Sequence, residues 1–138
     1  MKITIPGQPI AKKRPRFARR GKFVVTYNDQ QTDEGKALAI IMQQYQSRPA
    51  IEGAVCVDFT FFVSRPKGHF GTGKNAGMLK SSAPVMPTTK PDIDNCVKFY
   101  LDILNGWAWH DDNQVVKLAA VKEYGDPKTV ISISKMWE

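Results

Sequence analysis

The sequence lacks any apolar run that approaches the ~20 residues of a membrane-spanning helix, so we do not expect it to cross a membrane. Its opening stretch is interrupted by Pro6, Gly7 and Pro9, which argues against the unbroken apolar core of a secretory signal peptide. Cysteine is also scarce: only Cys56 and Cys96 occur, far apart and each among apolar neighbours. We therefore expect two free, buried thiols in a reducing compartment, and hence a cytoplasmic protein.

Acidic residues are outnumbered. There are 13 Asp and Glu against 20 Lys and Arg, which gives a formal net charge of +7 and a pI near 9.5. This balance favours a polyanionic partner, above all nucleic acid, over a neutral metabolite. With 138 residues, the chain is long enough for one domain with its own hydrophobic core and too short for two ordinary domains. We expect a single domain over residues 1–138.

The positive charge is densest between residues 12 and 22, where seven of eleven residues are cationic. Phosphates relieve the mutual repulsion of such a segment and release counterions on binding, so the segment predicts contacts with a DNA backbone. The candidate DNA-binding residues are Lys12, Lys13, Arg14, Arg16, Arg19, Arg20 and the more distant Lys90. A solvated arm that only keeps the protein soluble is the alternative.

Hydrophobic periodicity predicts an α+β domain with a β-sheet packed by two helices. The helices are expected over 33–47, with Leu38, Ile41, Met42 and Tyr45 as the apolar face, and over 92–104, with Ile93, Val97, Leu101 and Leu104 as the buried stripe. Alternating or β-rich stretches predict strands over 23–27, 54–63, 114–124 and 129–137.

Residues 64–91 show no convincing periodicity and exceed the length that a compact domain usually leaves without structure, so this loop is expected to be functional or disordered. Residues 68–74 match the first seven positions of a phosphate-binding P-loop. Asn75 replaces the Ser or Thr that would meet magnesium, and the residues that follow do not predict the required helix. We therefore discount nucleotide hydrolysis and keep Lys67 and Lys74 as candidate phosphate contacts.

Aspartates are concentrated in residues 90–114. Asp92 and Asp94 stand at the start of the predicted second helix, Lys98 and Asp102 share a helix face with Asp94, and Asp111 and Asp112 precede the next strand. Carboxylates gathered in a basic protein repel one another and nearby phosphate unless a cation lies between them. Oxygen-only ligands suit Mg²⁺, with Mn²⁺ as a substitute, better than zinc.

Each of these residues also has a purely structural interpretation. Asp92 could cap the helix, Asp94 and Lys98 could form a surface ion pair, and Asp111 and Asp112 could form a turn before a strand. Trp107 and Trp109, between the two acidic clusters, are expected to pack in the core.

The order and spacing of these residues resemble RusA-type Holliday junction resolvases. The pattern comprises Asp92-Ile93-Asp94-Asn95, Lys98, Leu101-Asp102, Leu104, Gly106, Trp109 and Asp111-Asp112-Asn113-Gln114-Val115. The opening Ile5-Pro6-Gly7-Gln8-Pro9, followed by residues 12–17, is similar to phage-type members. The resemblance therefore spans most of the chain and is weakest in residues 64–90.

The resemblance implies a small homodimer with a mixed sheet, which binds four-way DNA junctions and makes paired symmetric nicks during recombination and repair. It implies Asp92, Asp94 and Asp112 as the ligands of catalytic magnesium, with Lys98 as the accompanying catalytic residue. Neither a nucleotide cofactor nor a membrane is expected. Two alternatives stay open: a metal nuclease for other branched or flapped DNA, and a non-catalytic DNA-binding module.

Overall fold

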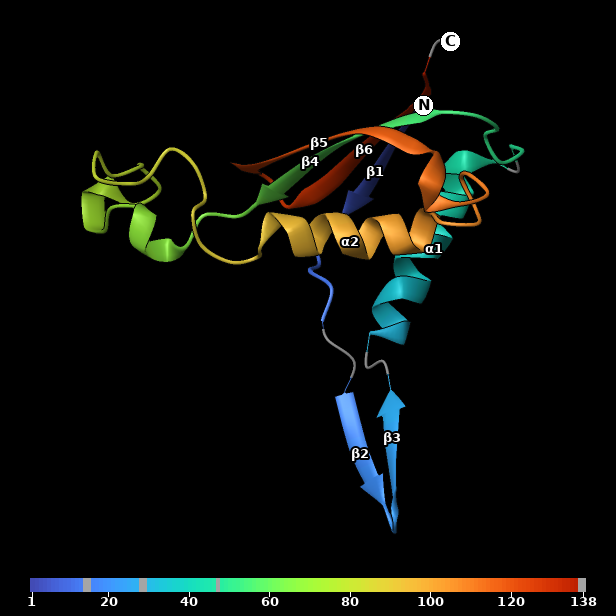
Figure 1. Ribbon diagram of the computed structural model, residues 1–138. Coiled ribbons are helices and arrows are strands. Elements are labelled where there is room, and N and C mark those ends of the chain that lie inside the picture. The colour runs from blue at the N-terminus through green and yellow to red at the C-terminus, as the bar shows by residue number, and fades with distance from the viewer. Residues whose placement is uncertain (14–15, 28–29, 47, 137–138) are drawn as a thin grey trace.

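The computed structural model describes residues 1–13, 16–27, 30–46 and 48–136 (Figure 1). The strands are β1 (Lys2–Pro6), β2 (Arg16–Arg20), β3 (Phe23–Tyr27), β4 (Val55–Val63), β5 (Val115–Tyr124) and β6 (Lys128–Lys135), and the helices are α1 (Gln31–Tyr45) and α2 (Ile93–Leu104). Four strands form a mixed sheet in the order β1-β6-β4-β5, with both helices against one face. Strands β2 and β3 form a separate hairpin that projects from this body. The structure thus confirms the expected small α+β domain.

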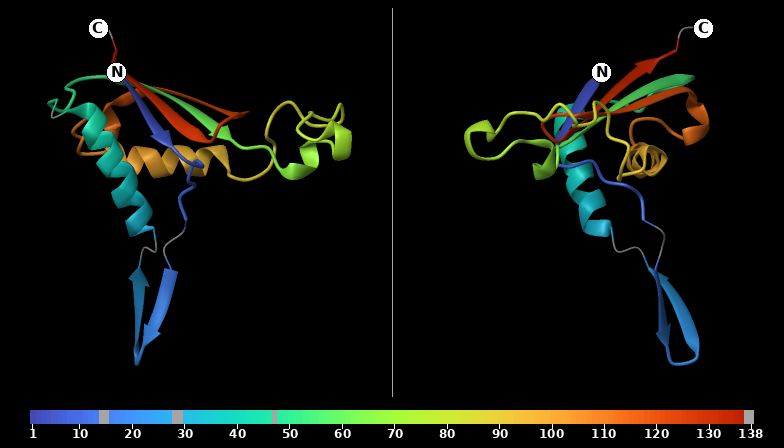
Figure 2. Two further views of the ribbon diagram at one scale, coloured as in Figure 1. Left: turned by 180° about the vertical axis from the view of Figure 1, so that it is seen from behind. Right: turned by 90° about the vertical axis from the view of Figure 1, so that its left-hand side faces the viewer.

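The link between β4 and β5 determines where α2 lies. These strands are parallel neighbours, and parallel strands need a long crossover connection. Within this crossover, α2 runs back beneath the sheet (Figure 2). The start of α2 therefore lies at the end of the sheet where β4 and β5 finish, and the end of α2 lies where β5 begins. The other two strand pairs, β4–β6 and β1–β6, are antiparallel.

The core lies between the sheet and the helices. Alternate residues of β4, among them Val57, Phe59 and Phe61, point toward the helices and are buried, whereas Asp58 on the opposite face is exposed. The rings of Phe59 and Phe61 stack at 5.4 Å, and Tyr100 of α2 lies within 6.4 Å of both. This aromatic contact fixes α2 against the centre of the sheet.

Most of the predicted elements are confirmed, with small shifts at their ends. The helix expected over 33–47 begins and ends two residues earlier, and Ser47 lies outside the described residues. The strand expected over 129–137 begins one residue earlier and ends at Lys135, and Trp137 lies outside the described residues. Cys56 and Cys96 are free and buried, as expected. Trp109 is fully buried, and the partly buried Trp107 packs edge-on against Tyr45.

The predicted apolar faces of both helices were wrong in part. On α1, Ala37, Ile41 and Tyr45 are buried, but Met42 is 47% exposed. On α2, the fully buried positions are Cys96, Phe99, Tyr100 and Leu104, whereas Ile93, Val97 and Leu101 are only partly buried. The reason is that α2 turns its large rings toward the sheet, so its aliphatic stripe lies at the margin of the core.

Residues 64–91 are ordered into two 3-10 turns, Lys67–His69 and Gly73–Asn75, rather than into a long element. A single 3-10 turn stands where a P-loop would require an α-helix, which agrees with the discounting of that motif. Within the described ranges, no helix combines the length and apolar character needed to span a bilayer.

Candidate active site and nucleic-acid interface

Asp92 occupies the N-cap position of α2 but does not cap it with its side chain. Its backbone is extended, with φ −71° and ψ 132°, and its carboxylate makes no capping hydrogen bond. The side-chain contact it makes in the described structure is the acceptance of a long hydrogen bond, 3.5 Å, from the Asn95 amide. The structural interpretation of Asp92 as a side-chain cap is therefore not supported, and an exposed carboxylate remains at the positive end of the helix.

Asp94 and Lys98 lie one turn apart on the exposed side of α2. The described structure contains no ion pair between them, so the surface ion-pair interpretation is not supported either. Both side chains are therefore available to a ligand at the start of the helix.

Asp111 and Asp112 follow the other end of α2 and differ in role. Asp111 forms a capping box with Gln114 around a 3-10 turn, Asp112–Gln114, so its expected structural role is confirmed. Asp112 Oδ1 accepts a hydrogen bond of 2.8 Å from the indole Nε1 of the buried Trp109. This contact orients the Asp112 carboxylate and leaves its second oxygen available.

One chain does not bring the predicted metal ligands together. A helix of 12 residues is about 18 Å long. Asp92 and Asp94 lie at its start, whereas Asp112 lies beyond its end. Among the described residues, no group of three or more His, Cys, Asp or Glu side chains is placed to hold a metal ion. A single chain therefore does not fit the expected ion, and the predicted ligand set stays a prediction.

Lys12, one of the candidate DNA-binding residues, is engaged within the protein. Its Nζ lies 3.0 Å from Glu34 Oε1 on α1 and 3.3 Å from Asp102 Oδ2 on α2. Burial alone would lower the pKa of Lys12, but its hydrogen bonds to these two carboxylates and their charges outweigh burial and raise the pKa. Its backbone amide also donates to Asn95 O at 2.8 Å. Lys12 thus fastens the N-terminal segment to both helices.

A groove beside Asp92 is lined by Lys13 and Lys90, among other residues. Both lysines are exposed. The backbone of the groove is held by the buried Gln30, whose Oε1 accepts from Lys13 N at 2.8 Å and whose Nε2 donates to Ala11 O at 2.9 Å. The structure therefore brings two predicted DNA contacts to the start of α2, where they would attract a phosphate.

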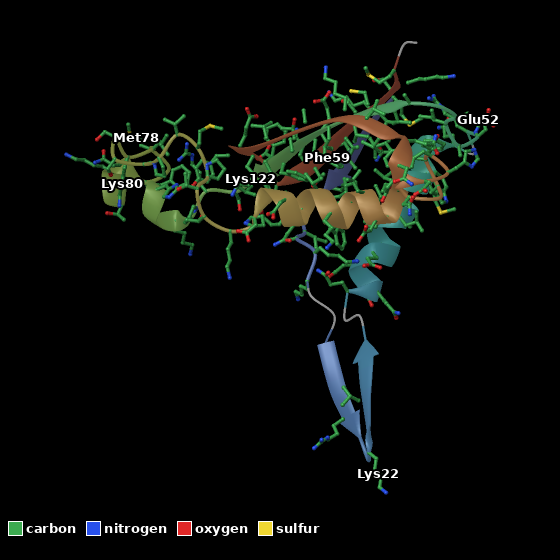
Figure 3. The ribbon with its side chains drawn as sticks, viewed as in Figure 1. Lys22, Glu52, Phe59, Met78, Lys80 and Lys122 are labelled. Carbon is green, nitrogen blue, oxygen red and sulfur yellow. The ribbon has the colours of Figure 1, made fainter. Side chains whose placement is uncertain are left out.

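Of the remaining predicted DNA contacts, Arg16, Arg19 and Arg20 belong to the hairpin, which also carries Lys22. Arg19 and Lys22 are exposed, and Lys22 lies at the outer end of the hairpin (Figure 3). Gly21 forms the turn with a φ of +61°. Arg14 and the side chains of Arg16 and Arg20 lie outside the described residues. The basic segment is thus a hairpin rather than a featureless arm.

Lys122 is a positioning residue that the sequence did not reveal. Its Nζ donates to Thr89 O at 2.7 Å and to Pro91 O at 2.9 Å, directly before Asp92. It pairs with Phe61, on the helix-facing side of β5. One indication of this role was present in the sequence: Lys122 stands at a strand position where the alternation of apolar and polar residues predicts a buried apolar side chain.

Cys96 lies near the acidic pair but does not suit nucleophilic chemistry. Burial raises the pKa of its thiol to about 11, with smaller effects from Lys122, which lowers it, and from Asp92 and Asp94, which raise it. The thiol is therefore protonated at neutral pH, whereas the thiolate is the reactive form.

Comparison with known proteins identifies the family. The chain matches the family described as Endodeoxyribonuclease RusA over residues 6–134. It is also similar to the uncharacterized protein YqaN of Bacillus subtilis (strain 168), with 31% identity over 138 residues that cover 99% of this chain and 96% of that protein. Because the family match spans nearly the whole chain, the protein belongs to the RusA family of endodeoxyribonucleases, which hydrolyse phosphodiester bonds of DNA.

Proposed function

We propose that the protein is a magnesium-dependent homodimer that resolves four-way DNA junctions by paired symmetric nicks in recombination and repair, on DNA in the cytoplasm. The observation that carries the proposal concerns Asp92 at the N-cap of α2, and Asp94 and Lys98 in the first half of this helix. In the described structure, Asp92 does not cap the helix with its side chain, and Asp94 and Lys98 form no ion pair with each other. These residues have the order of the motif that resembles the family, and Asp92 also lines the groove that contains Lys13 and Lys90.

The residues in and around the start of α2 can each take a different role in phosphodiester hydrolysis. Lys13 and Lys90 would hold phosphates of the bound strand in the groove. The Lys98 ammonium would stabilise charge that develops on the oxygens of the reacting phosphate. A divalent cation held by the aspartates would supply Lewis-acid stabilisation and a more acidic water.

The separation of the aspartates supports a dimer. A two-fold axis perpendicular to α2 would set the helices of two chains antiparallel, so that the start of one helix faces the end of the other. Asp92 and Asp94 would then meet Asp112 of the partner subunit and complete an oxygen ligand set. β5 offers a surface for such pairing, because it is an edge strand on which Val116 and Leu118 are 61% and 48% exposed.

The test is cleavage of a labelled synthetic four-way junction by the wild type and by Asp94→Asn, with Mg²⁺ or a chelator, beside a linear duplex of the same sequence. We expect symmetric nicks in the junction only, and only with Mg²⁺. Asp94→Asn should slow nicking by at least about a hundredfold, because it weakens the hold on the cation that would stabilise the reacting phosphate, while junction binding persists. Asp58→Asn is the matched control, since Asp58 is exposed on the open face of the sheet.

Other results would redirect the assignment. Binding without cleavage under Mg²⁺ and Mn²⁺ would identify a non-catalytic module. Nicks in linear or flapped DNA at the same rate would retain the nuclease and contradict junction specificity. Equal activity of Asp94→Asn and Asp58→Asn would remove Asp94 from the site.

A further inference from the structure

Residues 64–89, which we call the basic lobe, carry positive charge without any acidic residue. No Asp or Glu occurs from residue 59 to residue 91, although the average acid content of the chain would place about three in a stretch of that length. The same stretch contains Arg65, Lys67, Lys74, Lys80 and Lys90. Such one-sided charge favours a polyanionic surface as a partner.

The basic lobe has a defined fold of its own. Phe70 and Leu79 form an antiparallel bridge, flanked by hydrogen bonds from Gly71 N to Met78 O, 2.9 Å, and from Lys80 N to His69 O, 2.8 Å. The turn inside this bridge is tight, because a Cβ on Gly71 would lie 2.7 Å from the Asn75 carbonyl oxygen. The lobe therefore holds its lysines in fixed relative positions.

Two cationic side chains hold the basic lobe to the body. The Arg65 guanidinium donates to Pro84 O at 2.8 Å and stacks over the Tyr124 ring, 4.2 Å from its centre. His69 contacts the edge of the same ring, with the ring centres 5.4 Å apart. Lys122 bonds to Thr89 O at the other end of the lobe. These contacts occupy Arg65 and Lys122 structurally and fix the lobe beside the start of α2.

Within the described part of the chain, three lysines of the lobe make no side-chain hydrogen bond or ion pair. Lys67, Lys74 and Lys80 are exposed, and no hydrogen bond or ion pair to their ammonium groups is present in the described structure. Figure 3 shows Lys80 far out on the lobe and Lys122 close to the start of α2. The lobe and the β2–β3 hairpin leave the body in different directions (Figures 1 and 2).

We propose that the basic lobe binds the sugar–phosphate backbone of one arm of branched DNA through Lys67, Lys74 and Lys80, while the hairpin contacts another arm. This inference rests on the proposed junction-resolving function. A straight duplex that follows one of the two projections does not follow the other, whereas a four-way junction offers an arm to each. The lobe therefore contributes selectivity for branched DNA as well as affinity.

The test measures the affinity of the full chain for a four-way junction and for a linear duplex, in a chelator, over a range of salt concentrations. The triple substitution Lys67→Gln, Lys74→Gln and Lys80→Gln, called the lobe triple, is compared with a control triple. The control triple is Lys2→Gln, Arg48→Gln and Lys135→Gln. Both triples remove three exposed cations, but the control residues lie near the chain termini and the end of α1, away from the lobe. Thermal unfolding of both variants checks that the fold is intact.

We expect the lobe triple to weaken junction binding at least about tenfold and to reduce the slope of log K against log salt by about two to three, since each phosphate contact contributes about 0.9. Duplex binding should weaken less, and the control triple should change junction binding by less than about threefold. Equal losses from both triples, or no loss from the lobe triple, would overturn the inference.

A Mg²⁺ cleavage assay on the same samples separates this inference from the proposed function. If the wild type binds the junction but does not nick it, the proposed function fails while the binding comparison still decides the role of the lobe. If the wild type nicks junctions, and the lobe triple binds the junction as tightly as the wild type with the same preference over the linear duplex, only the lobe inference fails. A wild type that does not bind DNA would overturn both.

Discussion

A basic residue in this chain either can contact DNA or stabilises the fold, and its neighbours in three dimensions decide which. Lys12 and Lys13 are adjacent in the sequence and equally basic. The side chain of Lys12 is 22% exposed and contacts Glu34 and Asp102, whereas Lys13 is exposed and makes no ion pair in the described structure. The sequence predicted both as DNA contacts, because the carboxylates that engage Lys12 come from distant segments.

Lys12→Met is expected to lower the free energy of unfolding by about 1 kcal/mol, because it removes two charge-assisted contacts of a partly buried ammonium group. The pKa of Lys12 is raised in the folded state, so its contribution is full below the unfolded pKa and is lost as the pH rises through the folded pKa. Urea unfolding at pH 7 and near pH 11 should therefore show a difference from wild type that shrinks at the higher pH.

Lys13→Met is the control for that experiment. Since Lys13 is exposed, its replacement should change the free energy of unfolding by less than about 0.5 kcal/mol. It should instead reduce the salt slope of DNA binding by about one, the value for one phosphate contact. The reverse result, in which Lys13 stabilises the fold and Lys12 sets the salt slope, would contradict the assignment of the two residues.

At the level of elements, the hairpin is structurally separate from the body. β2 and β3 pair with each other and form a sheet apart from the four-stranded one. At the base of the hairpin, the buried Gln30 forms hydrogen bonds with the backbone of Ala11 and Lys13. These bonds link the segment that precedes the hairpin to the segment that follows it. The described core residues all belong to other parts of the chain.

Replacement of Arg16–Tyr27 by a short Gly-Ser linker should therefore leave the body folded, with a melting temperature within a few degrees of wild type. DNA affinity should fall at least about tenfold, because several basic side chains leave with the hairpin. Circular dichroism melting and a binding titration measure the two effects. A loss of cooperative unfolding would show that the hairpin is part of the core.

Elements with strong periodicity were predictable, and those defined by distant pairing were not. β4 shows clear alternation, and α2 has a recognisable start at Asp92. β1 is only five residues long and depends on pairing with β6 at the far end of the chain, so its local pattern carried little information. The same holds for the rotation of α2 about its own axis. This rotation is determined by the contact between Tyr100 and the Phe59 and Phe61 rings of β4.

At the scale of the whole molecule, the candidate site could be predicted as a set of residues but not as a geometry. The motif identified Asp92, Asp94, Lys98 and Asp112, yet spacing along the chain did not show that the length of α2 would separate them. Under the proposed function, each chain therefore carries two half-sites, one at each end of α2. If the proposed dimer forms, every complete site takes Asp94 from one chain and Asp112 from the other.

Mixed dimers test this arrangement directly. Asp94→Asn and Asp112→Asn should each abolish nicking alone, and asparagine at position 112 keeps an oxygen that can accept the bond from Trp109. In a mixed dimer of the two variants, one site combines both substitutions and the other combines two native aspartates. Co-refolding equal amounts should therefore restore about a quarter of the wild-type sites, since about half of the dimers are mixed. The restored activity should give single nicks rather than paired ones.

The matched control is a mixture of Asp92→Asn and Asp94→Asn. Both residues lie at the start of the same helix, so neither site of the mixed dimer contains a complete native set and no activity should return. If each chain instead assembled its own site, the mixture of Asp94→Asn and Asp112→Asn would be as inactive as this control. Recovery in both mixtures would point to a site in which either chain can supply each aspartate, which contradicts the shared-site geometry.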